Sequence, residues 1–166
     1  MTAEQTSATD TGRAGPSDPR WVVVSSLLLA LVGLAVSAYL TYEHYSASTT
    51  LACPENSAIN CVKVTSSSYA ELLGVPVALL GLLFYLGVTA LCLPTAWRAS
   101  SPWVGRIRLL AAASGVVFVL YLVWAELFRI DAICLWCTVV HVATVALFAV
   151  IVVGAALRPI DPDALR

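Results

Sequence analysis

The sequence predicts an all-α membrane protein, a bundle of four transmembrane helices with a long non-cytoplasmic loop between the first helix and the second. Composition is the first reason. Of the 166 residues, 60% are hydrophobic and only 11% are charged, with a mean hydropathy of +0.87, whereas a soluble domain has roughly 45–50% apolar and about 25% charged residues. The second reason is four long apolar runs, each of which reaches the roughly 17–25 residues that cross a bilayer.

We place these spans at about residues 21–42, 75–97, 107–127 and 132–157. The third span contains Arg108, whose side chain we expect to snorkel toward the membrane surface. The spans together form one domain over residues 21–157. Residues 1–20 are predicted to be a disordered cytoplasmic tail because they are polar and rich in Ser, Thr, Gly and Pro. Residues 158–166 form a short second tail.

The distribution of basic residues predicts the orientation. With four spans, both termini and the loop between spans two and three share one side of the membrane. That side holds seven of the nine basic residues, and the other side holds only Lys63 and Arg129. Basic residues are enriched on the cytoplasmic side of membrane proteins. We therefore expect a multi-pass protein of the cytoplasmic (inner) membrane with both termini in the cytoplasm.

Four of the five cysteines map to the non-cytoplasmic side. Cys53 and Cys61 lie in the first loop, and Cys134 and Cys137 lie at the start of the fourth span. Disulfides form and persist on that side of the membrane in most cells. The fifth, Cys92, falls near the cytoplasmic end of span two, where we expect it to be a small apolar packing residue.

The Cys134–Cys137 segment is the most informative motif. Asp131 is a favourable N-cap, which predicts that the helix begins at Ala132. Cys134 would then lie near unpaired N–H groups and the positive end of the helix dipole, which favour its thiolate, although the charge of Asp131 opposes this. Residues three apart share a helix face and are close enough for a disulfide. We expect Cys134 at the membrane surface and Cys137 about one turn deeper, so that one thiol can meet a water-side partner and the other a lipid-side partner.

Two structural roles compete with redox chemistry. The four cysteines could bind zinc, but the seven residues between Cys53 and Cys61 exceed the usual spacing of two to four. They could also form purely structural disulfides. We favour a shuttle, because the loop from Glu43 to Gly74 is longer than a plain connector and mobile cysteines can attack a second disulfide by thiol–disulfide exchange.

Taken together, these motifs resemble the vitamin K epoxide reductase family, in its bacterial quinone-linked branch. The similarity covers roughly Trp21 to Leu157. The matching segments are Cys53-x7-Cys61, Lys63–Ser67, Tyr69-Ala70, Gly74-Val75-Pro76 and Cys134-Leu135-Trp136-Cys137.

The resemblance implies a four-helix bundle around a quinone, with the Cys134–Cys137 pair beside its ring. Cys53 would take electrons from a thioredoxin-like or DsbA-like partner. Cys61 would form the mixed disulfide with Cys134, Cys137 would face the quinone, and Ser67 would match the family's functional serine. Many bacterial relatives carry a fused thioredoxin-like domain. Because the sequence ends at Arg166, we expect a separate partner protein.

Three polar residues have alternative interpretations. His141 replaces the tyrosine of animal members; it either contacts the quinone or bonds a neighbouring helix. Ser67 either contacts the quinone or a thiolate, or caps a helix. Glu126 and Arg129 are expected to form a surface ion pair of little energetic value, unless Glu126 relays protons.

The sequence therefore predicts a thiol oxidase that passes electrons to menaquinone or ubiquinone and supports disulfide formation in exported proteins. No metal and no nucleic acid are expected to bind. Reduction of a quinone epoxide is the alternative enzyme, and a membrane metal-binding or assembly subunit without turnover is the alternative of another class. A DsbB-type oxidase shares the chemistry, but its C-x2-C motif lies early in the chain.

Overall fold

The computed structural model describes residues 19–46, 53, 56, 58–99 and 101–157. This part of the chain is mostly helical, and it also contains two strands of two residues each. The predicted tails, except Pro19 and Arg20, lie outside it. In chain order the elements are α1 (Arg20–Ser46), α2 (Cys61–Thr65), the 3-10 helix η1 (Ser68–Ala70), β1 (Glu71–Leu72), β2 (Val75–Pro76), α3 (Val77–Cys92), α4 (Pro94–Arg98), α5 (Pro102–Ala125), the π-helical turn η2 (Glu126–Ile130) and α6 (Leu135–Ala156).

The length and apolar character of the helices confirm an all-α membrane protein. Arg20–Ser46, Trp103–Ile130 and Leu135–Ala156 are each long and apolar enough to cross a membrane. The helix α3 is equally apolar but has only 16 residues. That all four helices cross the bilayer therefore stays a prediction.

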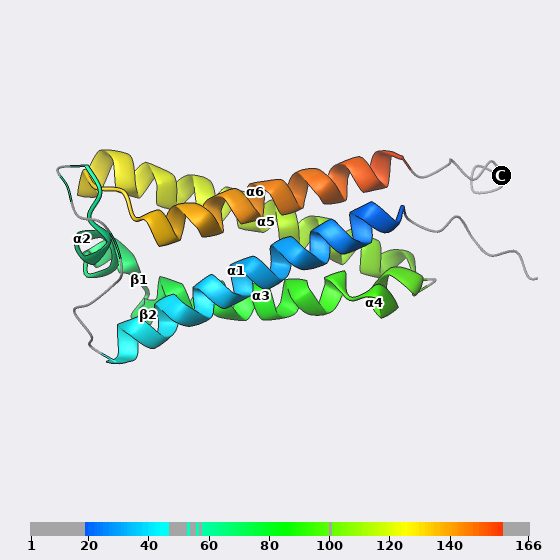
Figure 1. Ribbon diagram of the computed structural model, residues 1–166, viewed down its shortest axis with the longest axis horizontal. Helices are drawn as coiled ribbons and strands as arrows, with labels where there is room; N and C mark the ends of the chain where they lie inside the picture. Colours follow the sequence, from blue (N-terminus) through cyan, green and yellow to red (C-terminus); the bar gives the residue numbers. More distant parts are fainter. Residues whose placement is uncertain (1–18, 47–52, 54–55, 57, 100, 158–166) are drawn as a thin grey trace, which may run out of the picture.

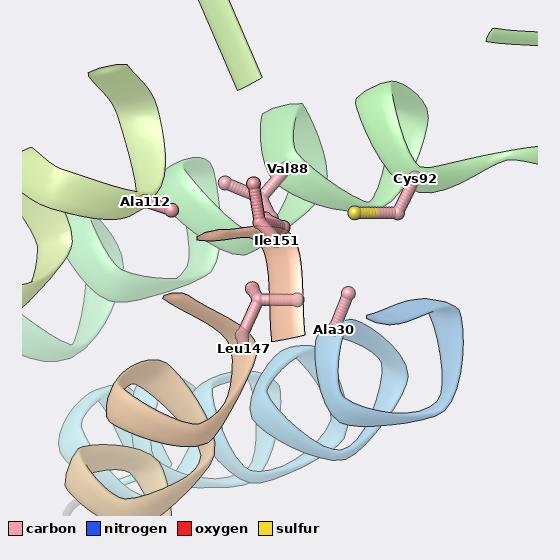
Figure 2. Close-up of a cluster of buried hydrophobic side chains, with 6 residues drawn as sticks. All are labelled: Ala30, Val88, Cys92, Ala112, Leu147 and Ile151. Carbon is pink, nitrogen blue, oxygen red and sulfur yellow. The ribbon is translucent and has the colours of Figure 1, made fainter. Parts of the chain in front are cut away.

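The four long helices pack side by side, with α1 against both α3 and α6, and α5 against α6 (Figure 1). Figure 2 shows a buried cluster to which each of them contributes. Its members are Ala30, Val88, Cys92, Ala112, Leu147 and Ile151. Cys92 is thus a buried packing residue, as the sequence predicted.

The second long helix is shorter than predicted because of a proline. The expected span continued to residue 97, but α3 ends at Cys92. Leu93 is extended, with ψ 144°, and Pro94 begins the short helix α4. Proline disfavours helical backbone in the residue before it and has no N–H to continue the ladder.

Arg108 stabilises the break between α3 and α4. The expectation that its side chain snorkels toward the membrane surface is wrong. Its side chain is 3% exposed. Nε donates to the carbonyl of Leu91 (2.9 Å), and a terminal nitrogen donates to the carbonyl of Ala96 (3.3 Å). The guanidinium also lies over the Trp97 ring, 3.4 Å from its centroid. The cation satisfies carbonyls that the broken helix leaves without intrahelical partners.

The other end of the bundle carries a small cap, made of α2, η1 and the β1–β2 hairpin (Figure 1). A parallel bridge between Ile59 and Ile133 joins this cap to the segment that precedes α6. Asn60 N–H donates to Ile133 O (3.1 Å), and Ile133 N–H donates to Ala58 O (2.9 Å). The bridge places the first cysteine pair beside the second.

Candidate active site

The start of α6 differs from the prediction. Asp131 is not its N-cap: it ends η2 in a left-handed conformation (φ 51°), and its carbonyl accepts from Lys63 Nζ (3.2 Å). The helix begins at Leu135, with Cys134 as its N-cap. The bridge to Ile59 holds Ile133 in extended backbone, so the helix cannot begin before it.

The N-cap position gives Cys134 its electrostatic environment. Cys137 N–H donates to Cys134 Sγ at 3.3 Å. The pKa of Cys134 is lowered, chiefly by a hydrogen bond with the Cys137 thiol and further by the N–H groups of Cys137 and Trp136, while burial and the charge of Glu126 oppose the shift. Cys134 is therefore the thiol of the pair that ionises more readily, and thiolate is the nucleophilic form.

The first cysteine pair is joined as a disulfide. The Cα atoms of Cys53 and Cys61 are 6.2 Å apart. Cys61 is the first residue of α2, a helix of five residues that is too short to be stable alone. The side chain of Asn60 caps this helix by accepting from Lys63 N–H (2.8 Å). The cap and the Ile59 bridge together fix the position of Cys61.

All four predicted cysteines meet in one apolar cluster. Its buried members are Cys61, Val64, Ile130, Ala132 and Cys134, and Cys53, Tyr69, Trp136 and Cys137 pack against them. Cys134 and Cys61 are both fully buried. The expectation that Cys134 faces water at the membrane surface is therefore wrong: it lies in the same cluster as the loop pair.

Cys137 also faces a cavity of about 680 Å³ inside the helical bundle. The wall is mainly aliphatic and aromatic, and Phe84 and Tyr85 belong to it. Ser67 and His141 line the same cavity, so the structure brings these two predicted ligand-binding residues to one space with Cys137. The volume is within the 300–1,000 Å³ of typical small-molecule sites. An apolar wall with a few polar groups suits the ring and aliphatic chain of a quinone.

Ser67 and His141 differ in their hydrogen bonds. Ser67 Oγ donates to Val64 O (2.8 Å), and it makes no side-chain cap of η1. Its proton is thus engaged, and its oxygen is left to accept. His141 is 7% exposed, and within the described part of the chain it makes no hydrogen bond to a neighbouring helix. The imidazole is therefore available to a bound molecule.

Glu126 is a site residue that the sequence offered only as an alternative, in which it relays protons instead of forming a surface ion pair. The predicted surface ion pair with Arg129 is wrong: Arg129 Nε donates to Tyr69 Oη (2.7 Å), while Glu126 is 6% exposed and lines the cavity. Its carboxylate interacts with the backbone N–H of Cys134. Helical spacing suggested the pair, but Tyr69 is brought close only by the fold.

The alternative zinc site is not assembled among the residues that the structure describes, where no group of three or more potential ligands occurs. The Cys53 and Cys61 sulfurs are bonded to each other, whereas zinc requires thiolates.

A membrane helical bundle with two cysteine pairs in one cluster, one of them opening on an apolar cavity, belongs to the class of membrane thiol–disulfide oxidoreductases. The family model described as the vitamin K epoxide reductase family matches residues 24–152. The match covers most of the chain, and the protein belongs to this family. Its members are oxidoreductases that use quinones and generally work with a thioredoxin-like partner.

Proposed function

We propose that this protein is a quinone-dependent thiol oxidase that takes electrons from a thioredoxin-like or DsbA-like protein outside the cytoplasm. Electrons pass through Cys53 and Cys61, then through Cys134 and Cys137, to menaquinone or ubiquinone in the membrane. One observation carries the proposal. Cys137 both packs on the cysteine cluster and lines the cavity, whereas Cys134 belongs to the cluster.

The two cysteine pairs divide the work. A partner dithiol reduces the Cys53–Cys61 disulfide by way of a mixed disulfide on Cys53. Cys61 then exchanges with the disulfide form of Cys134 and Cys137, which it reaches without a large movement because Cys61 and Cys134 share one cluster. Burial of Cys134 favours this order, since an external protein has no direct access to its sulfur.

The cavity supplies the binding site for the quinone. When bound, a quinone accepts two electrons and two protons. His141 is positioned to hydrogen-bond a ring oxygen, and Ser67 Oγ to accept from a reduced ring. The apolar wall suits the aliphatic chain.

The proposed topology places four spans across the cytoplasmic membrane, with this site on the non-cytoplasmic side. At about 1.5 Å per residue, the 16 residues of α3 cover about 24 Å. The hairpin before it and α4 behind it extend α3 toward the two surfaces (Figure 1). Labelling of Lys63 and Arg98 from opposite faces of the membrane tests this orientation.

The direct test is quinone reduction by the purified protein, with a reduced thioredoxin-like donor. Cys137→Ala is expected to abolish reduction of the quinone. Cys53→Ala should block the protein donor but spare a small dithiol. If both donors still work in Cys53→Ala, the order of the relay is wrong; if the unchanged protein reduces no quinone, the proposed function is wrong.

His141→Phe separates ligand contact from packing. The substitution keeps a ring of similar size, so it should lower turnover without preventing folding. Unchanged kinetics would make His141 a packing residue.

A further inference from the structure

Glu126 has an orientation opposite to that of its apolar neighbours in the π-helical turn η2. Leu127 and Phe128 point outward and are 50% and 73% exposed, while Glu126 is turned inward and is 6% exposed. Packing alone would favour the reverse in a membrane helix. A carboxyl group buried with few hydrogen-bond partners costs several kcal/mol, so its place in the wall calls for a chemical reason.

Its surroundings identify that reason. The carboxylate interacts with the N–H of Cys134, at the start of α6, where the helix dipole also favours negative charge. Its charge acts on both Cys134 and Cys137. It also lines the cavity that Cys137 faces. Glu126 is thus an ionisable group next to the dithiol and next to the space for its oxidant.

We propose that Glu126 is the proton-transfer residue between the Cys134–Cys137 dithiol and the quinone. This inference rests on the proposed function. Cys134 is the thiol that ionises first, so the remaining thiol proton belongs to Cys137. The Cys137 S–H bond breaks, and its proton forms an O–H bond on the Glu126 carboxylate. The Cys134–Cys137 S–S bond forms as two electrons go to the quinone. The Glu126 proton then passes to a quinone oxygen, and water supplies the second proton.

Other titratable groups on nearby elements or on the cavity wall could take part, and the test must separate them from Glu126. They are Cys134, Cys137 and His141 around α6, Lys63 on α2, Tyr69 on η1, Glu43 and His44 on α1, and Arg129 and Asp131 on the connection itself.

Glu126→Gln keeps the shape and an acceptor for the Cys134 N–H but cannot carry the proton. In the full-length protein with a small dithiol as donor, quinone reduction should fall about a hundredfold, as general acid–base catalysis is worth that much or more. Glu71→Gln removes an exposed carboxyl from the same end of the protein and should leave the rate unchanged. An unfolding curve in detergent that matches that of the unchanged protein, measured on the same sample, shows that Glu126→Gln is folded.

A second measurement needs no quinone. In the dithiol form the Glu126 carboxylate lies next to the Cys137 thiol proton, and in the disulfide form that proton is gone. The infrared difference spectrum between the two forms should therefore contain a shifted carboxylate band that is absent in Glu126→Gln and present in Glu71→Gln. A band that survives in Glu126→Gln, or quinone reduction within twofold of the unchanged protein, overturns the inference. If the unchanged protein reduces no quinone, the proposed function fails, and the infrared band alone decides whether the Glu126 carboxylate lies against the thiol proton of the dithiol.

Discussion

Replacing Asn60 by alanine tests how the first cysteine pair is held over the second. The Asn60 side chain caps α2 through Lys63 N–H (2.8 Å), and loss of an N-cap costs about 1 kcal/mol. The helix has five residues, so its position depends on this cap and on the bridge to Ile133, which the substitution leaves intact. Opening of α2 should become about fivefold more frequent, which is the factor that about 1 kcal/mol gives at room temperature.

The assay is alkylation of Cys134 in the form with a Cys53–Cys61 disulfide and free Cys134 and Cys137 thiols. Cys134 is fully buried, so reagent reaches it only when the structure opens locally, and its rate follows the opening equilibrium. Asn60→Ala should raise this rate about fivefold, while the partly exposed Cys137 is labelled as before. Equal Cys134 rates in the two proteins would show that α2 does not cover this sulfur, and the reasoning would fail.

Three further experiments test the bundle, the thiol and the cavity. Gly33→Ala places a methyl group on the ring of Tyr85 and should lower the free energy of unfolding in detergent by about 1–3 kcal/mol, whereas Gly87→Ala meets nothing within 4 Å and should change it little. The pKa of Cys134 is lowered in the fold, so its thiolate persists to lower pH than that of an unfolded cysteine, whose pKa is about 8.5. The alkylation rate of Cys134, corrected for access, should therefore stay high below that pH. It should be lost only as the pH falls through the lowered pKa of the folded protein. An alkylated dimethoxybenzene resembles a quinone but cannot be reduced. At ten times its Kd it should occupy the cavity and slow alkylation of Cys137 about tenfold. Equal protection of Cys134 would contradict the separation of the two sulfurs.

Residue patterns with local causes were predictable from the sequence. Apolar runs gave the membrane class, and the grouping of Cys53, Cys61, Cys134 and Cys137 on one side anticipated their meeting in one cluster. The early end of α3 was also a local effect: Pro94 was visible, but the long uncharged run concealed its consequence.

Errors arose where a distant segment decides the local structure. Asp131 is a good N-cap by residue type, yet the bridge from Ile59 to Ile133 keeps the following residues out of the helix. Arg129 is correctly spaced for a pair with Glu126, yet the hydroxyl of Tyr69 takes its guanidinium. Neither partner is close in sequence, so no local pattern indicates it.

The later start of α6 has a consequence for the proposed redox cycle. With Leu135 as the first helical residue, Cys134 is the N-cap and Cys137 the third residue, and the Cys134 sulfur accepts from Cys137 N–H as a capping oxygen does. A disulfide between these residues would join the same two positions that the hydrogen bond joins now. The helix therefore keeps a fixed first turn whether the pair is oxidised or reduced. In the proposed path α6 therefore stays fixed during thiol–disulfide exchange between the two cysteine pairs. The short helix α2, which carries Cys61, makes the movement that this exchange requires.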